Sequence, residues 1–131
     1  MRTRQEMFTI AAAHLVKQNR RATCAGDNEI GCMYRAPDGA QCAIGCLIPD
    51  DKYNPDFEGN VICGTGELGS MWAGRILEAA GIAYSDRYFA QDLQAIHDRE
   101  QPHEWPLKLM SFAVLHKLTM PPELQVCVNE R

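Results

Sequence analysis

The chain has 131 residues and a formal net charge of −4, with 46% hydrophobic and 23% charged residues. This length predicts a single domain over residues 1–131, and the composition is typical of folded rather than disordered proteins. A nucleic-acid-binding protein normally carries a basic face. The charges here are dispersed and mildly acidic, so we expect no nucleic-acid partner.

The six cysteines are expected to be reduced thiols. Residues 1–7 lack the apolar core of a secretory signal, and no apolar run reaches the roughly 20 residues of a membrane-spanning helix. We therefore expect a cytoplasmic protein with no membrane partner. Disulfides are rare in that compartment.

Residues 3–19 are predicted to form an amphipathic helix. Thr3 and Glu6 have the spacing of a capping box, and the apolar residues that follow recur at helical intervals. Residues 20–29 are polar and contain a Gly-Asp-Asn run, which predicts a loop.

The segment 31–50 combines a tight turn with two short apolar runs. The Pro-Asp-Gly sequence at 37–39 is typical of turns, because Pro presets φ, Asp bonds its own backbone and Gly tolerates positive φ. The flanking runs can pair, which predicts a small β-hairpin around residues 31–44. Residues 42–48 lack strand alternation, so a short helix there is the alternative.

The rest of the chain reads as one long connection followed by helices. Residues 49–66 are rich in Pro and Gly, and connections of this length are often functional. Helical spacing then predicts three helices, at 67–80 with Gly81 as the C-terminal cap, 85–98 and 102–117. Leu68, Met71, Trp72, Ile76 and Ala79 form the expected core stripe of the first. The tail is expected to hold a last helical turn or an edge strand. The expected fold class is α+β, mainly helical with about four helices and the small hairpin.

Two blocks of sequence are distinctive. The first is CxYRxPDGxxCAIGCLIPD at residues 32–50, and the second is LQxIHD at residues 93–98, followed by Trp105, Leu109, Phe112, Ala113 and His116. In these blocks the chain resembles a family of small uncharacterised proteins from phages, prophages and proteobacteria, over nearly its whole length. The resemblance implies a compact accessory protein of a mobile element. It carries no activity and no functional residues.

A cysteine nucleophile is one catalytic hypothesis. If residues 42–48 are helical, Cys42 lies at a helix N-terminus, where partial positive charge lowers a thiol pKa. His97 or His103 would act as the base, with Asp98 or Asp38 orienting it. This predicts a small hydrolase or transferase. In a chain with six Cys and four His, however, such combinations also arise by chance.

A structural zinc site is a second hypothesis. Zinc is usually held by two pairs of thiolate or imidazole ligands, and Cys42 and Cys46 qualify as one pair. The sequence offers no matching second pair, and Cys is often a small core residue. We therefore expect no cofactor and no metal.

The resemblance to mobile-element proteins, the small size and the lack of a convincing active-site motif together favour a non-enzymatic protein that binds and inhibits a host protein, for example an anti-CRISPR inhibitor of a bacterial defence system. The expected contact surfaces are the turn at 37–41 and the loop 49–66. Exposed aromatic residues there would act as anchors, because interfaces favour Tyr, Trp and Arg. The candidate binding residues are Tyr34, Arg35, Asp38, Tyr53 and Phe57. Arg35 is also expected to serve the scaffold by reaching Asp38 or Asp50. A homodimer is expected on general grounds, since twofold pairs are the commonest oligomers.

Overall fold

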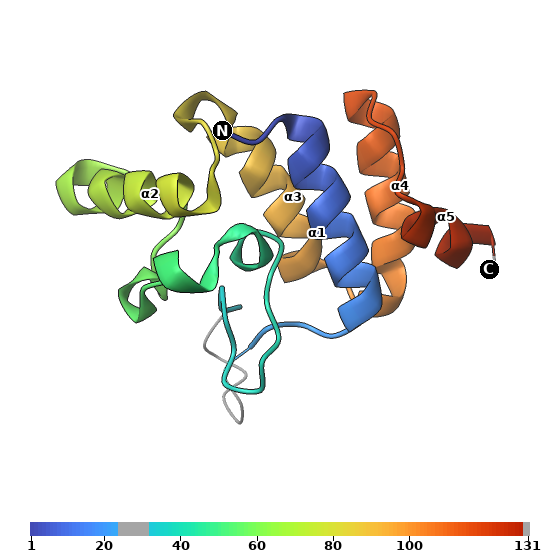
Figure 1. Ribbon diagram of the computed structural model, residues 1–131, viewed down its shortest axis with the longest axis horizontal. Helices are drawn as coiled ribbons and strands as arrows, with labels where there is room; N and C mark the ends of the chain where they lie inside the picture. The colour runs from blue at the N-terminus through green and yellow to red at the C-terminus, as the bar shows by residue number, and fades with distance from the viewer. Residues whose placement is uncertain (24–31, 130–131) are drawn as a thin grey trace.

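The computed structural model describes residues 1–23 and 32–129, apart from the side chains of 126–129 (Figure 1). Its α-helices are α1 (Arg4–Gln18), α2 (Gly66–Ala80), α3 (Arg87–Arg99), α4 (Trp105–His116) and α5 (Pro122–Asn129). Short 3₁₀ turns lie between them: η1 (Gly45–Leu47), η2 (Asp50–Lys52), η3 (Pro55–Phe57), η4 (Tyr84–Asp86) and η5 (Pro102–Glu104). In these described residues, none of the helices has the length and apolarity that crossing a bilayer requires.

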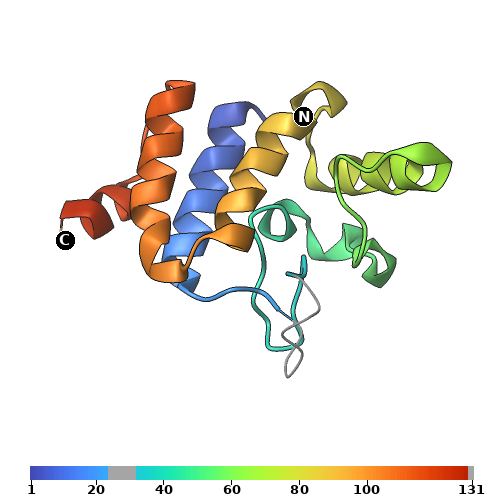
Figure 2. The same cartoon turned by 180° about the vertical axis from the view of Figure 1, so that it is seen from behind.

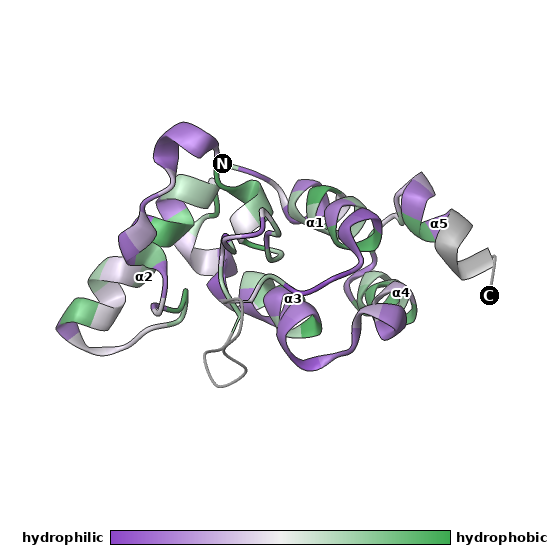
Figure 3. Cartoon of the chain, turned by 90° about the horizontal axis from the view of Figure 1, so that it is seen from below, coloured by the Kyte–Doolittle hydropathy of each residue, from purple (hydrophilic) through white to green (hydrophobic). Residues whose placement is uncertain are grey.

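Helices α1, α3 and α4 form the centre of the molecule. They run side by side in Figures 1 and 2, and the view along them in Figure 3 shows a triangular arrangement. Aromatic rings fill the space between them: Phe112 of α4 stacks on Phe8 of α1 at 5.7 Å and meets Phe89 of α3 at 5.2 Å between ring centroids. Because each such ring buries a large apolar area, this cluster is a main source of the core's stability.

The start of α1 confirms the predicted capping box. The Thr3 hydroxyl accepts from the Glu6 backbone N–H at 3.1 Å, and the Glu6 carboxylate accepts from the Thr3 N–H at 2.9 Å. Two backbone donors that a helix start leaves free are thereby satisfied. The neighbouring Arg2 binds the carbonyl oxygens of Ala80 and Leu47, which ties the N-terminus to the end of α2.

Helix α2 projects from the central helices (Figure 1). Gly81 ends it in the left-handed conformation, with φ of 72°, as predicted. The expected apolar stripe is confirmed in part: Ile76 is buried, and Trp72 and Ala79 pack half-buried against the core. Its first two members were wrong, because Leu68 is 70% exposed and Met71 is exposed as well. The fully buried residues of the helix are Ala73, Ile76, Leu77 and Ala80.

The predicted β-hairpin around residues 31–44 was wrong, and with it the α+β class. Residues 24–31 lie outside the described part. In the remainder, β-structure is limited to the isolated bridges Thr23–Cys32 and Arg35–Gln41. The fold is helical, and the tail forms the further helix α5. The Pro-Asp-Gly turn itself is present, because the Asp38 carboxylate accepts from the Ala40 N–H at 2.9 Å.

Two side-chain contacts explain why no hairpin forms. The Glu58 carboxylate accepts from the backbone N–H groups of Tyr34 at 2.9 Å and Arg35 at 3.1 Å. The Tyr34 N–H is the donor that would continue the pairing beyond the Arg35–Gln41 bridge. After Cys42 the chain turns into η1, close to the alternative predicted for residues 42–48. Gly45 packs there against the Tyr34 carbonyl so closely that a Cβ would overlap it.

The long connection 49–66 is folded into η2 and η3 rather than free. Phe57 is buried and makes edge contacts with Tyr53 at 6.2 Å and with Trp72 of α2 at 6.3 Å. Arg35 reaches Asp50 in a 2.7 Å ion pair, as predicted, and lies over the Tyr53 ring. This connection therefore joins α2 to the rest of the core.

Candidate functional site

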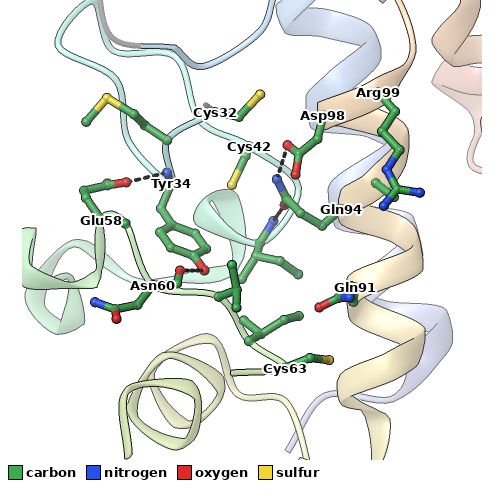
Figure 4. Close-up of a pocket in the computed structure, with 16 residues that line it drawn as sticks. Cys32, Tyr34, Cys42, Glu58, Asn60, Cys63, Gln91, Gln94, Asp98 and Arg99 are labelled. Carbon is green, nitrogen blue, oxygen red and sulfur yellow. Dashed lines mark hydrogen bonds between the residues drawn. The ribbon is translucent and has the colours of Figure 1, made fainter. Parts of the chain in front are cut away.

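A pocket of about 580 Å³ lies beside α3 (Figure 4). One wall is α3 between Gln91 and Arg99, and the other is formed by residues 58–63. Residues 32–34, Cys42 and Ile44 close the remaining side. Its size falls within the range of ligand-binding pockets, so it is the first place to look for a function.

His97 of α3 is fully buried beside this pocket. Its Nε2 accepts from the Ala22 backbone N–H at 3.0 Å, and its Nδ1 lies 2.8 Å from Oδ1 of Asp98. A backbone N–H can only donate, so Nε2 carries no proton and the neutral ring donates from Nδ1 to the carboxylate. The Trp105 ring, stacked at 5.4 Å, holds the imidazole in place.

Asp98 collects hydrogen bonds from several sides. Besides His97, the Gln94 amide donates to it at 2.8 Å, and the Cys32 sulfur lies within 4.8 Å of a carboxylate oxygen. Burial acts to raise the pKa of Asp98, but these hydrogen bonds together outweigh burial and hold its pKa below the usual value. Asp98 is therefore an ionised carboxylate at neutral pH.

Cys32, His97 and Asp98 form a thiol–imidazole–carboxylate cluster in which the three ligand atoms lie within 4.8 Å of one another. The pKa of Cys32 is raised to about 12, first by burial and then by the charge of Asp98. The thiol is consequently protonated, and it is a poor nucleophile.

The tautomer of His97 limits what this cluster can do. A general base or a metal ligand needs an imidazole nitrogen with a free lone pair. Nε2 uses its lone pair on Ala22, and Nδ1 carries the proton given to Asp98. If a metal bound Nδ1, the neutral ring would have to carry its proton on Nε2. That N–H would then face the Ala22 N–H, which is also a donor. His97 and Asp98 thus belong to a structural hydrogen-bond network that joins the segment around Ala22 to α3.

The predicted nucleophile, Cys42, is not the thiol of this cluster. Cys42 lines the same pocket as Asp98, but it is fully buried, and its sulfur accepts from the Gly45 N–H at 3.2 Å. Burial raises its pKa well above the ordinary value. Cys32, which the sequence hypothesis did not include, is the thiol next to His97 and Asp98. His103 is exposed in η5.

The predicted zinc pair lies on the turn around η1. The Cys46 thiol donates to the Ala43 carbonyl at 3.1 Å, and its pKa is raised to about 12, chiefly by burial. Both sulfurs of the pair are thus engaged with nearby backbone. Cys32, Cys42, Cys46 and Cys63 are free thiols. Cys24 and the side chain of Cys127 lie outside the description.

Three of the predicted binding residues, Tyr34, Arg35 and Tyr53, contact Glu58. This carboxylate accepts from the Tyr53 hydroxyl at 2.6 Å in addition to the two backbone donors, and the Tyr34 hydroxyl donates to the Asn60 carbonyl at 2.6 Å. The expected exposure of these aromatic residues was wrong, because Tyr34 is 9% and Phe57 4% exposed. They hold the pocket wall in position.

Arg35 and Asp38 have different surroundings. The Arg35 guanidinium binds Asp50 and donates to the Ile48 carbonyl at 2.6 Å, so it joins the turn to the long connection. Asp38 is exposed at the turn and lies 3.4 Å from Arg20. Of the predicted binding residues, Asp38 is the one that stands clear on the surface.

Exposed aromatic residues occur instead at the start of α3. Tyr84 is 53% and Tyr88 62% exposed, and the Arg87 guanidinium lies 4.0 Å and 4.6 Å from the centroids of their rings. Val61, 60% exposed, lines the pocket. The sequence signal for this surface was an arginine close to two tyrosines: Tyr84 lies in η4 and Tyr88 in the first turn of α3, and Arg87 contacts both rings.

No family model matches this chain, and no curated protein or solved structure does either.

Proposed function

We propose that this chain is a non-enzymatic accessory protein of a phage or prophage that works in the cytoplasm by binding and inhibiting a host protein. An inhibitor of a bacterial defence system, of the anti-CRISPR type, is the most specific form of this proposal. The phage setting rests on the resemblance of residues 32–50 and 93–98 to proteins of mobile elements.

One observation carries the choice of binding over catalysis. Neither the imidazole nor the thiol beside the pocket is available for chemistry: His97 uses both ring nitrogens in hydrogen bonds, and burial and the charge of Asp98 raise the pKa of Cys32 to about 12. Catalytic groups need a free lone pair or a lowered thiol pKa. What remains is a shaped, partly apolar cavity, and such a cavity suits recognition.

The exposed tyrosines favour a protein as the ligand. Tyr and Arg are enriched among the residues that dominate binding energy at protein interfaces. Arg87 stacks against Tyr84 and Tyr88, so part of the side-chain ordering cost is met before binding. This surface adjoins the pocket, because Gln91, one turn after Tyr88, lines it.

The test is affinity capture from host lysate with the wild-type chain and with the variants Cys32→Ser, Cys42→Ser and Tyr88→Ala. If the chain is a binding protein, the wild type captures one host protein in stoichiometric amount. Both serine variants are then expected to capture as much of it, and Tyr88→Ala is expected to capture much less. A thiol enzyme would instead lose its effect on the host in one serine variant by orders of magnitude. That result, or the lack of any stoichiometric partner, would overturn the proposal.

A further inference from the structure

We infer that the pocket beside α3 binds an extended peptide segment of the partner, in which an apolar side chain enters the pocket and a neighbouring carboxylate binds Arg99. This inference rests on the proposed function and adds the chemistry of the segment that is recognised.

The floor of the pocket suits an apolar side chain. It is lined by Ile44 and Ile62, which are buried in the core, and by Ala95 of α3, with Val61 at its exposed edge. Apolar surface removed from water stabilises a complex by about 25 cal/mol per Å² before the costs of association. A bulky aliphatic or aromatic side chain is therefore the natural occupant.

The charged side chains of the pocket indicate that the peptide also carries a carboxylate. The two carboxylates of the pocket are engaged from within the fold: Glu58 accepts from three donors, and Asp98 accepts from His97 and Gln94. Arg99 is exposed, lines the pocket and has no ion-pair partner among residues 1–23 and 32–129. Guanidinium groups bind carboxylates and phosphates. The nearby Asp98 favours the singly charged carboxylate, because repulsion from it grows with the charge of the ligand.

The length of the site points to a peptide. Tyr88, Gln91, Ala95 and Arg99 are spaced along one face of α3, and the last three line the pocket. From Tyr88 to Arg99 the helix rises about 16 Å, which matches about five residues of extended chain. A segment of this length reaches from the exposed tyrosine, across the pocket, to the arginine.

The experiment selects ligands from a bead-displayed library of random heptapeptides and measures the Kd of the best peptide. The expected peptides have a bulky apolar residue within a few positions of Asp or Glu. Arg99→Glu and Val61→Glu are expected to weaken binding by about tenfold or more, the loss of roughly one charge-assisted contact. Lys108→Glu and Val114→Glu are matched controls on exposed positions of α4 and are expected to leave the Kd unchanged.

A charge exchange makes the test specific. Replacing the acidic residue of the selected peptide by Lys is expected to weaken binding to the wild type and to restore binding to the Arg99→Glu variant. Circular dichroism confirms that each variant is folded. The inference is overturned if the library yields no peptide, if the selected peptides lack an acidic residue, or if only the α4 variants weaken binding.

The two proposals fail in different ways. If the host partner is captured normally by both Arg99→Glu and Val61→Glu, the protein still binds a host protein but through another surface. If no partner is captured by the wild type, the proposed function itself is wrong.

Discussion

The backbone N–H of Ala22 and the Nε2 atom of His97 meet at 3.0 Å across 75 residues of sequence. Arg21 binds the same part of α3, donating to the carbonyl oxygens of His97 and Glu100. The two Arg21 contacts satisfy carbonyl oxygens at the end of a helix, where no helical backbone partner is available. The segment after α1 is therefore attached to the C-terminal end of α3, beside the pocket.

Replacing His97 by Asn tests this attachment. The variant leaves the Ala22 N–H and part of the Asp98 carboxylate without partners, and a buried unsatisfied group costs about 1–3 kcal/mol. We expect a loss of that size in the free energy of unfolding measured in urea at pH 7. His103→Asn, at an exposed position, is the control and is expected to change it by less than about 0.5 kcal/mol. Equal effects of the two variants would contradict the assigned role of His97.

Asp98 predicts a defined dependence of stability on pH. Hydrogen bonds from His97 and Gln94 outweigh the effect of burial and lower the pKa of Asp98 in the folded state. The unfolded value is about 3.9, so this contribution is complete above that pH and disappears as the pH falls through the lower native pKa.

The variant Asp98→Asn isolates this contribution. At pH 7 we expect it to lower the free energy of unfolding by about 1–2 kcal/mol, and the difference from the wild type is expected to shrink as the pH falls from about 5 towards 3. Urea titrations over this range measure it, with Asp92→Asn on the same helix as the control. A difference that stays constant or grows at low pH would contradict the assignment.

The features that were predicted correctly from the sequence are those that depend on residues close together in the chain. The capping box of Thr3 and Glu6, the Gly81 cap and the Asp38 turn are set by residues two to five positions apart, and all three are confirmed. For Arg35 the sequence left Asp38 and Asp50 as alternative partners, and the structure pairs it with Asp50.

The site could not be predicted because its contacts are long-range. Glu58 takes the backbone donors of Tyr34 and Arg35 from 24 and 23 residues away, and the pairing across the turn stays limited to the bridge between Arg35 and Gln41. Cys32 approaches His97 through the fold and not through spacing in the sequence, so Cys42, next to a helical turn, appeared to be the better candidate. Local patterns carry no information about either contact.

The thiols beside the pocket are expected to react slowly in the folded protein. Because burial and Asp98 raise the pKa of Cys32 to about 12, very little of this thiol is thiolate at pH 8. Burial also protects Cys42. Iodoacetamide labelling at pH 8, followed by peptide mass spectrometry, should show labelling of both residues at least about 100-fold slower than in urea. Rapid native labelling of either residue would revive the thiol-enzyme hypothesis.

Replacing the Glu58 carboxylate by an amide is expected to lower the stability of the fold. In Glu58→Gln the amide group places donors against the donors of Tyr34, Arg35 and Tyr53, so the pocket wall loses part of its support. We expect the free energy of unfolding to fall by about 1–3 kcal/mol. Glu78→Gln, exposed on α2, is the control and is expected to have little effect. Thermal unfolding followed by circular dichroism compares the two.

Two glycines are expected to respond in opposite directions to the same substitution. A Cβ on Gly45 would overlap the Tyr34 carbonyl, which is backbone and cannot rotate away. Gly45→Ala must therefore displace η1 from the residue 34 segment, and we expect a loss of about 3 kcal/mol or more, or failure to fold. Gly74, inside α2, has no heavy atom within 4 Å of an added Cβ. Gly74→Ala is expected to stabilise by about 0.5–1 kcal/mol, since Ala is the better helix former. Urea unfolding of both variants decides the matter, and a tolerated Gly45→Ala would mean that Tyr34 and η1 are not packed as described.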